Sequence, residues 1–230
     1  MTSQVITVHR DVLAEARADA DEFRGAMARR GTLVVNLLSS PGAGKTSLLA
    51  ATARHWSARE PERRPSMAVL VGDLATDRDA QRLAPFVPVV QMTTGGACHL
   101  ELPLVARAWR SLADFSGEFL MIENVGNLVC PASHDLGEHL RVILLSSTEG
   151  DDKPGKYPKA FRTSQALVMS KLDLLPYVPF SVAAATADAR AIQPGLAVLP
   201  LSALDGAGVA AWCEYLEGER RKLLARNSCV

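Results

Sequence analysis

Residues 33–57 of the chain read LVVNLLSSPGAGKTSLLAATARHWS. This segment begins with an apolar run typical of a buried strand, passes through a loop with two glycines, and continues as a helical pattern. From Ser39 to Thr46 the loop follows the pattern G-x-x-x-x-G-K-(S/T), with serine in the first glycine position. Because the backbone N–H groups of such a loop and the N-terminus of the next helix attract anions, the segment predicts a phosphate-binding loop. A chance glycine-rich turn is the alternative, but strand, loop, Lys-Thr and helix all follow in the expected order.

Each part of this P-loop has a predicted role. Lys45 is expected to neutralise the β- and γ-phosphates of a nucleoside triphosphate, and the hydroxyl of Thr46 is expected to bind Mg²⁺. The two glycines allow backbone N–H groups to turn toward phosphate oxygens. The predicted nucleotide-binding residues of the loop are Ser40, Gly42, Ala43, Gly44, Lys45, Thr46 and Ser47.

Further apolar runs alternate with helical patterns along the chain. Including the first strand, the runs lie at 32–38, 67–73, 87–92, 118–123, 141–147, 166–171 and 196–202. They lack strict two-residue alternation, as expected for parallel strands that helices cover on both faces. The clearest helical patterns lie at 45–57, 99–113 and 208–226. The sequence therefore predicts an α/β fold: a doubly wound, mostly parallel sheet of about seven strands with helices on both faces.

An amphipathic helix is predicted before the first strand. Apolar residues recur at three- and four-residue steps between residues 9 and 30. We therefore expect residues 1–30 to form an N-terminal helix packed on the core, and residues 31–230 to form the nucleotide-binding domain. Polar breaks at 59–65 and 149–158 are interpreted as loops within that domain.

Charge and composition exclude several classes of partner. Lys plus Arg and Asp plus Glu number 25 each, so no net field attracts nucleic acid or an anionic membrane. No segment reaches the roughly 20 apolar residues of a membrane span, and the N-terminal residues lack the apolar core of a signal peptide. The four cysteines are too sparse for a disulfide scaffold. We expect a cytoplasmic protein with no nucleic-acid or membrane partner.

Acidic residues lie at the ends of two predicted strands. Asp73 closes MAVLVGD, with Asp77 shortly after it, and Glu123 closes EFLMIE. Because ligands of such sheets lie outside the carboxyl ends of the strands, these three acids and Lys45 are the candidate catalytic residues. We expect Glu123 or Asp73 to share the Mg²⁺ ion with Thr46, since magnesium prefers oxygen ligands. Helix capping is the alternative role for Asp77.

The sixth predicted strand runs into SKLD at 170–173, which matches the guanine-binding pattern N-K-x-D apart from its first residue. Asp173 can accept hydrogen bonds from guanine N1–H and the exocyclic amine, a pair of donors that adenine lacks. Lys171 can lay its stem along the base, and Ser202 and Ala203 match the S-A element that contacts the base through backbone. GTP is therefore the predicted nucleotide. The serine at the first position predicts a shorter reach to the base and to the P-loop, and a plain strand-to-helix turn is the alternative.

A possible metal site involves two cysteines and a histidine. Cys98 and His99 are adjacent in GGACHLE, and Cys130 follows Glu123 by seven residues. Thiolate and imidazole ligands suit zinc or nickel. Three ligands leave a tetrahedral site one short, so water, another residue or a second subunit would have to complete it. The alternative for each cysteine is apolar filler in the core.

The two other cysteines and the two histidines after Cys130 are not predicted as primary metal ligands. His134 and His139 follow Cys130 in a polar stretch and are predicted to be solvated, although either can supplement the site. Cys213, beside a tryptophan in the last helical pattern, and Cys229, near the chain end, are interpreted as incidental.

Together these motifs resemble the HypB family of GTPases, which assist nickel delivery to nickel–iron hydrogenase. The matching segments are SSPGAGKTSLL, GDLATDRDA, GGACHL, ENVGNLVCPASHDLGE, STEGDDKPGKYPKAF, SKLDLLPYVPF and SALDGAGVAAW. The resemblance implies a P-loop fold of the SIMIBI class, hydrolysis of GTP with Mg²⁺, and dimerisation on GTP binding. It also implies nickel or zinc at the dimer interface, bound by Cys98, His99 and Cys130. The implied partners are nickel-delivery and hydrogenase maturation proteins, including the hydrogenase large subunit.

Some features of that family are missing from this sequence, and rival functions remain. Neither a cysteine-rich nickel motif nor a histidine-rich tract precedes the P-loop, so a storage function is not expected. The nearest rival is a urease accessory GTPase, which usually carries its ligands as Cys-Pro-His. A P-loop small-molecule kinase and a metal-binding protein with a degenerate nucleotide site are the other two.

Overall fold

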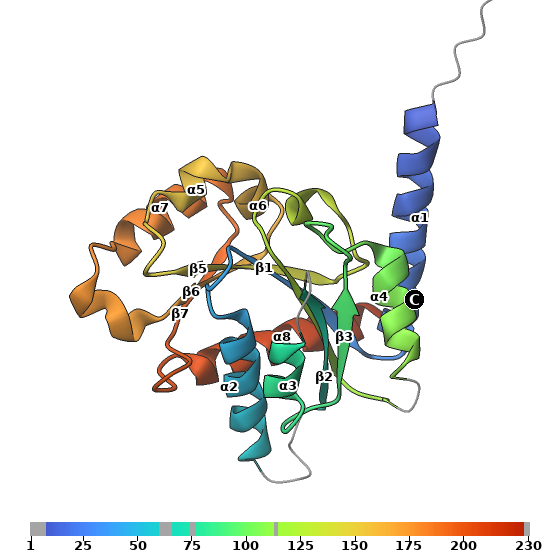
Figure 1. Cartoon of the computed structure of the whole chain (residues 1–230), viewed down its shortest axis with the longest axis horizontal. Coiled ribbons are helices and arrows are strands. Elements are labelled where there is room, and N and C mark those ends of the chain that lie inside the picture. Colours follow the sequence, from blue (N-terminus) through green and yellow to red (C-terminus); the bar gives the residue numbers. More distant parts are fainter. Residues whose placement is uncertain (1–7, 60–65, 74–76, 113–114, 228–230) are drawn as a thin grey trace, which may run out of the picture.

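The computed structural model describes residues 8–59, 66–73, 77–112 and 115–227, and it contains one seven-stranded sheet (Figure 1). The strands are β1 (Leu33–Ser39), β2 (Met67–Asp73), β3 (Val89–Thr93), β4 (Phe119–Gly126), β5 (Leu140–Ser146), β6 (Ala166–Ser170) and β7 (Ala197–Pro200). Their order is β3-β2-β4-β1-β5-β6-β7, and every neighbouring pair runs parallel. The predicted α/β class with about seven strands is confirmed.

Helices cover both faces of the sheet (Figure 1). They are α1 (Val8–Arg29), α2 (Lys45–Ser57), α3 (Arg78–Leu83), α4 (Leu102–Arg110), α5 (Lys153–Lys156), α6 (Pro158–Arg162), α7 (Val182–Ile192) and α8 (Val209–Asn227), with 3₁₀ helices η2 (Pro131–Ser133) and η3 (Leu172–Tyr177). Side chains alternate along β1: Val35 and Leu37 join the core under α2, α3 and α8, whereas Val34 packs with α1 and α4. Leu38 joins a third cluster under α6 and α7. This period of two is what places apolar side chains on both faces.

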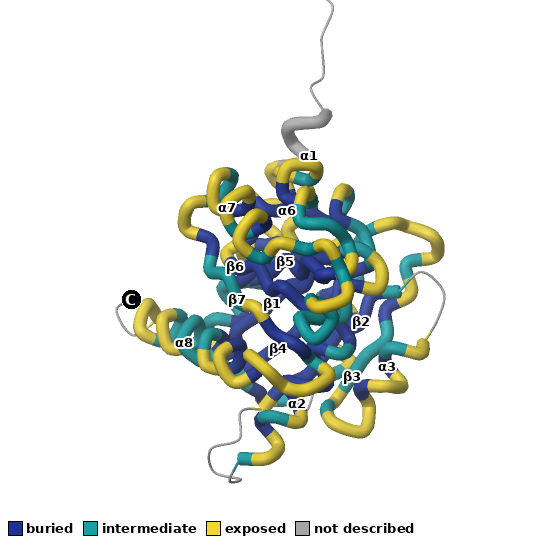
Figure 2. The backbone as a smooth tube through the Cα atoms, turned by 90° about the vertical axis from the view of Figure 1, so that its left-hand side faces the viewer, coloured by how far each residue is buried: buried dark blue, intermediate teal, exposed yellow. Residues whose placement is uncertain are grey.

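Burial follows the central strands of the sheet, and Figure 2 shows β1, β4 and β5 in the dark centre of the molecule with exposed helix surfaces around them, whereas the edge strands β3 and β7 are mostly of intermediate burial. Trp56 of α2 and Trp212 of α8 are fully buried, and the indole of Trp212 donates to Thr52 Oγ1 at 2.9 Å. Burying one large apolar side chain contributes about 1.5–3 kcal/mol, so these two helices hold the P-loop firmly on the sheet. Within the described ranges, no helix combines the length and apolarity needed to cross a membrane.

Two predicted boundaries differ from the structure. The helix predicted at 99–113 begins only at Leu102, because Pro103 favours the first turn of a helix and leaves Glu101 as an extended N-cap residue. His99 therefore lies in the loop before α4. The polar break at 149–158 contains α5 and the first residue of α6 rather than a plain loop. Most of the break at 59–65 lies outside the described residues.

Helix α1 packs on the segment that joins β4 to β5. Gly137 has φ of 72°, and a Cβ there would come within 2.7 Å of the ring of Phe23. The guanidinium of Arg24 donates to both carboxylate oxygens of Asp135 at 2.6 and 2.7 Å. His139 accepts from a β1 backbone N–H at 3.0 Å, and burial lowers its pKa to about 4. The prediction that His139 is solvated was therefore wrong; it is half-buried and neutral at pH 7.

Candidate functional site

The P-loop lies at the carboxyl edge of the sheet, between β1 and α2. Its two glycines have positive φ, 75° at Gly42 and 96° at Gly44, which only glycine adopts without strain. The ammonium of Lys45 donates to Ser39 Oγ at 2.9 Å, and burial lowers the pKa of this lysine. The serine at the first glycine position therefore holds the lysine at the mouth of the loop.

Thr46 and Glu123, which the sequence analysis expects to share Mg²⁺, contact each other in the structure. The hydroxyl of Thr46 donates to Glu123 Oε1 at 2.8 Å, and Oε2 of the same carboxylate is buried without a hydrogen-bond partner in the described part of the chain. Burial raises the pKa of Glu123 to about 7, although Lys45 and the hydroxyl bond oppose this rise. A buried carboxylate oxygen beside a hydroxyl suits a hard divalent cation, because the cation would satisfy the oxygen and favour its charge. Half-buried Asp73 lines the same cavity.

Removing the charge of Glu123 should change how stability depends on pH. Its folded pKa of about 7 lies above the ordinary value of 4.5, so the folded state holds a proton that the unfolded state releases between these values. The free energy of unfolding is therefore highest below pH 4.5 and falls by up to about 3 kcal/mol as the pH rises to 7, because the buried carboxyl group must then ionise in the folded state. Glu123→Gln should lack this loss. Urea unfolding at pH 5 and 8 without Mg²⁺ or nucleotide measures it, with Asp77→Asn as the control; equal pH dependence in wild type and Glu123→Gln would contradict the assignment.

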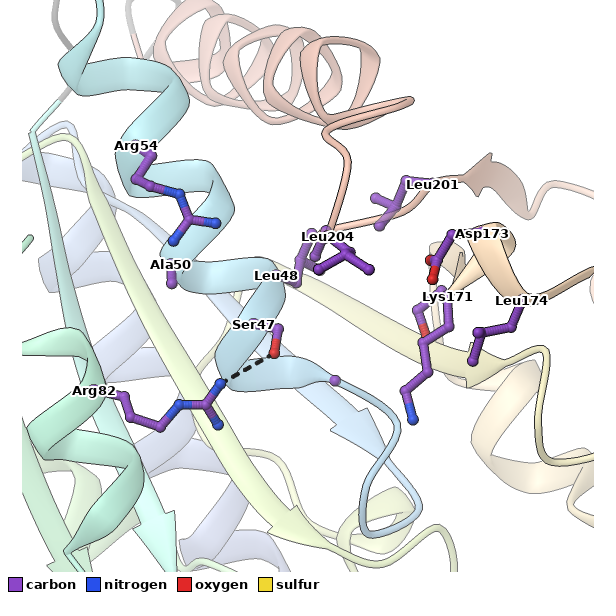
Figure 3. A pocket seen from close by; sticks show the side chains of 13 residues that line it. Ser47, Leu48, Ala50, Arg54, Arg82, Lys171, Asp173, Leu174, Leu201 and Leu204 are labelled. Atoms are coloured by element: carbon purple, nitrogen blue, oxygen red, sulfur yellow. Dashed lines mark hydrogen bonds between the residues drawn. The ribbon is translucent and has the colours of Figure 1, made fainter.

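Two adjoining cavities meet at the P-loop. The first, about 450 Å³, is lined by residues of the P-loop and of the acidic strand ends, including Lys45, Asp73, Asp79, Arg82 and Glu123. The second, about 370 Å³, lies between α2, η3 and the loop after β7 (Figure 3). Gly44, Ser47, Arg82 and Lys171 line both. The site thus offers a polar compartment suited to phosphates beside a more apolar one suited to a base.

The guanine-type residues line the second cavity. The hydroxyl of Ser170 donates to the Ala43 carbonyl of the P-loop at 2.6 Å, so the shorter reach predicted for this serine does not prevent its contact with the P-loop. Lys171, with a left-handed φ of 59°, lies beside the P-loop. Oδ1 of Asp173 accepts from Ser202 Oγ at 2.7 Å. This bond fixes the aspartate in the cavity, and Ala203 lines the same wall.

The orientation of α3 determines whether its N-cap residue Asp77 or its first-turn acid Asp79 faces the cavity lined by Lys45 and Glu123. Ala80 and Leu83 are buried under the sheet, so Asp79 and Arg82 line the cavity. The carboxylate of Asp77 instead accepts from the Gln81 side chain at 2.7 Å, and Asp77 is not among the cavity residues. The guanidinium of Arg82 donates to Ser47 Oγ at 3.4 Å, a hydrogen bond that is dashed in Figure 3. The sequence prediction named Asp77 and missed both Asp79 and Arg82.

A third missed residue comes from the break at 149–158. The ammonium of Lys153 at the start of α5 donates to Ser40 Oγ at 3.3 Å and lies 3.6 Å from the carboxylate of Glu149. It therefore brings a positive charge to the P-loop from a distant segment. The run STEGDDKPGKY carried a signal, since helix-starting Lys-Pro follows two acids, but spacing alone does not show where such a lysine points.

The three predicted metal ligands lie on two neighbouring loops. A hydrogen bond between the thiols of Cys98 and Cys130 raises the pKa of Cys98. Cys98 Sγ lies 3.8 Å from His99 Nδ1, and the Asn127 side chain donates to the Cys98 carbonyl at 3.2 Å, which ties the two loops together. Cys98 is exposed and Cys130 partly so. These side chains are thus accessible and mutually close.

His134 lies in this cluster. The prediction that it is solvated was therefore wrong. Its ring stacks on that of His99 with centroids 3.8 Å apart, and its Nδ1 lies 2.9 Å from the Cys130 carbonyl. Within the described residues, no group of three His, Cys, Asp or Glu side chains is arranged to hold a metal ion. Cys213 is fully buried, and burial raises its pKa to about 12, whereas Cys229 lies outside the described residues.

Comparisons with known proteins agree in sequence and structure. The profile of the CobW/HypB/UreG nucleotide-binding domain matches residues 33–200. The hydrogenase maturation factor HypB of Azotobacter vinelandii is 43% identical over 219 residues, which cover 95% of this chain and 71% of that protein. The crystal structure of HypB from Helicobacter pylori in complex with nickel has a TM-score of 0.84 at 36% identity, over 90% of this chain and 96% of that one. HypB from Archaeoglobus fulgidus gives 0.81 at 32% identity, over 90% and 99%.

Proposed function

Because the chain belongs to the HypB hydrogenase maturation factors of the CobW/HypB/UreG family, we propose that it is a GTP-hydrolysing nickel metallochaperone. It binds GTP with Mg²⁺, hydrolyses GTP to GDP and phosphate, and uses the nucleotide state to control a nickel or zinc site. Its partners are a second copy of the chain, nickel-delivery proteins and the hydrogenase large subunit, all in the cytoplasm.

Guanine recognition is carried by Asp173. The bond from Ser202 leaves its second carboxylate oxygen for the base, and the bond from Ser170 to the P-loop fixes the strand end that presents it. Guanine offers two adjacent N–H donors to a carboxylate, whereas adenine offers an acceptor at N1. This arrangement is the observation that most favours GTP.

Phosphate chemistry depends on positioning and on charge. Lys45 and the P-loop N–H groups hold the β- and γ-phosphates, while Thr46 and Glu123 hold Mg²⁺, which neutralises charge on the phosphate oxygens. Asp73 and Asp79 line the cavity where the attacking water would lie, and Arg82 brings a cation to its rim. Positive charge aimed at the developing phosphate charge is what accelerates such a reaction.

The cargo site needs a second copy of the chain. Cys98, His99 and Cys130 are close together but do not form a closed site in one copy. Their loops are at the surface, and Val129 beside them is 61% exposed, a large apolar side chain suited to an interface. Two copies joined here would supply enough thiolates and imidazoles for nickel or zinc. GTP binding should favour this dimer, since Glu123 and Cys130 belong to one continuous segment.

A nucleotide panel tests the proposal. The wild type should hydrolyse GTP and not ATP, and Asp173→Asn should bind GTP about 10–100-fold more weakly, since hydrogen bonds to a charged group contribute about 1.5–3 kcal/mol. The variant should gain affinity for xanthosine triphosphate, whose O2 accepts from an amide. Asp188→Asn, at an exposed position of α7, is the control. Preference for ATP with phosphate transfer to a small molecule would instead establish a kinase.

A further inference from the structure

A line of buried polar side chains crosses the sheet from the phosphate site to the loop that carries Cys130. Its members lie next to Glu123 in β4, in the middle of β1, and around the start of β5: Asn124, Asn36, Glu138 and Arg141. Their exposed fractions are 2%, 0%, 7% and 8%. Asn124 lines the phosphate cavity, whereas Asn36, Glu138 and Arg141 line neither the phosphate cavity nor the base cavity. Nucleotide binding therefore does not explain why these three polar side chains are buried.

Each member contacts the next. The Asn124 amide donates to Asn36 Oδ1 at 3.2 Å, and the Asn36 amide donates to Glu138 Oε1 at 3.2 Å. Nε of Arg141 donates to the same Glu138 oxygen at 2.7 Å. Since Asn124 follows Glu123 directly, the line starts one residue from the carboxylate assigned to Mg²⁺.

The far end of the line holds the metal loop by its backbone. The Arg141 guanidinium donates to the Ala132 carbonyl at 3.3 Å and to the His134 carbonyl at 2.7 Å. Oε2 of Glu138 accepts from the Leu136 N–H at 2.8 Å. The His134 ring in turn contacts the Cys130 carbonyl. One ion pair therefore fixes the loop from two to six residues after Cys130.

Stability alone does not account for this ion pair. Burying two charges carries a desolvation cost of several kcal/mol per ion, and apolar residues of similar volume are often at least as stabilising. What an arginine offers here is a planar fork that can bind a carboxylate and two carbonyls at once. Neither residue reaches the nucleotide or the thiols, so any role in function is through the loop.

We infer that Glu138 and Arg141 are positioning residues for the metal-binding loop, and that Asn36 and Asn124 link them to the nucleotide site. The inference rests on the proposed function. A shift of β4 at Glu123 on nucleotide exchange would move Asn124, and the line would pass this movement to the backbone around Cys130. The loop would then be set from both of its ends, through the chain itself and through Arg141.

The test compares nickel affinity in GDP with nickel affinity in a non-hydrolysable GTP analogue. For wild type the ratio should be about 5–150-fold, the usual range of coupling between two sites. Arg141→Met should bring the ratio close to one and weaken the nickel–thiolate absorption, while kcat for GTP stays near the wild-type value. Arg141→Lys, which keeps the ion pair but not the fork, should restore the ratio only in part.

Two further variants separate this role from a general loss of loop stability. Asn36→Leu breaks the line but leaves Arg141 on the loop, so it should lower the ratio without weakening nickel binding in GDP. Arg24→Met removes another arginine that binds the same segment, through Asp135 and the Glu138 carbonyl, but is not bonded to Asn36 or Asn124; its ratio should remain that of wild type.

The outcomes are distinct. A wild-type ratio of one, or nickel binding that survives Cys130→Ser, would overturn the proposed function. A normal wild-type ratio that persists in both Arg141→Met and Asn36→Leu would overturn the inference alone, as would an equal loss in Arg24→Met. If Arg141→Met does not fold, Asn36→Leu decides.

Discussion

Replacing Lys45 by alanine should reduce kcat for GTP hydrolysis at least about a hundredfold, the usual cost of removing one preorganised group that stabilises transition-state charge. Lys45 is 8% exposed, its ammonium donates to Ser39, and it lines the cavity shared with Glu123. Since it is already desolvated, its interaction with phosphate oxygens is stronger than in water. Phosphate release at saturating GTP measures the effect.

Lys156→Ala is the matched control for this variant. Lys156 is an exposed lysine of α5 that pairs with Asp152, so its loss should leave hydrolysis unchanged. Hydrolysis by Lys45→Ala at the wild-type rate would contradict the site. Nickel binding that depends on nucleotide in neither wild type nor Lys45→Ala would favour the rival in which the nucleotide site is degenerate.

Replacing Cys130 by serine should weaken nickel affinity at least about a hundredfold, because even residues that only support metal ligands cost 10–100-fold when removed. The thiol of Cys130 forms a hydrogen bond with that of Cys98. A serine hydroxyl is a harder and much poorer ligand for nickel than a thiolate. Titration against a competing chelator, followed by the nickel–thiolate absorption, measures the loss. GTP hydrolysis should persist, since Cys130 lies outside both nucleotide cavities.

Cys213→Ala is the control for this second prediction. Cys213 is fully buried in α8, and burial raises its thiol pKa to about 12, so it presents no thiolate to a metal. Nickel affinity should stay at the wild-type value. An equal loss of nickel affinity in the two variants, or no loss in Cys130→Ser, would show that Cys98 and Cys130 do not form the nickel site.

The main fold and the P-loop could be predicted because their signals are local. A strand, a glycine loop and a helix follow one another between residues 33 and 57, and apolar runs mark all seven strands. The sequence also predicted the Thr46–Glu123 pair in outline, because the carboxyl ends of parallel strands share one edge of the sheet.

Features that depend on helical phase or on side-chain direction could not be read in this way. Asp77 and Asp79 differ by two positions, and only the burial of α3 shows that the second one lines the cavity beside Lys45. Ser170 reaches the P-loop because the β6 end lies close to it, which compensates for its short side chain. His139 resembled a solvated residue in a polar stretch, but α1 covers it.

The line of buried polar side chains through Asn36 is only weakly indicated by the sequence. Asn36 interrupts the run LVVNLL, and Arg141 opens RVILLSS, so both are polar residues in otherwise buried strands. Such residues need partners, since an unpaired buried polar group costs about 1–3 kcal/mol. Their partners depend on the order of the strands in the sheet. The sequence does not show that β4, β1 and β5 are neighbours, whereas the structure does.

In the mechanism that we propose, nucleotide state and metal affinity are coupled. Its most direct measurement is nickel titration of the wild-type protein with GDP and with a non-hydrolysable GTP analogue, while light scattering follows dimerisation. We expect affinities that differ about 5–150-fold, with dimer formation in the GTP-analogue state. Nickel must then shift nucleotide affinity by the same factor. Identical nickel affinities in the two nucleotide states would contradict the claim.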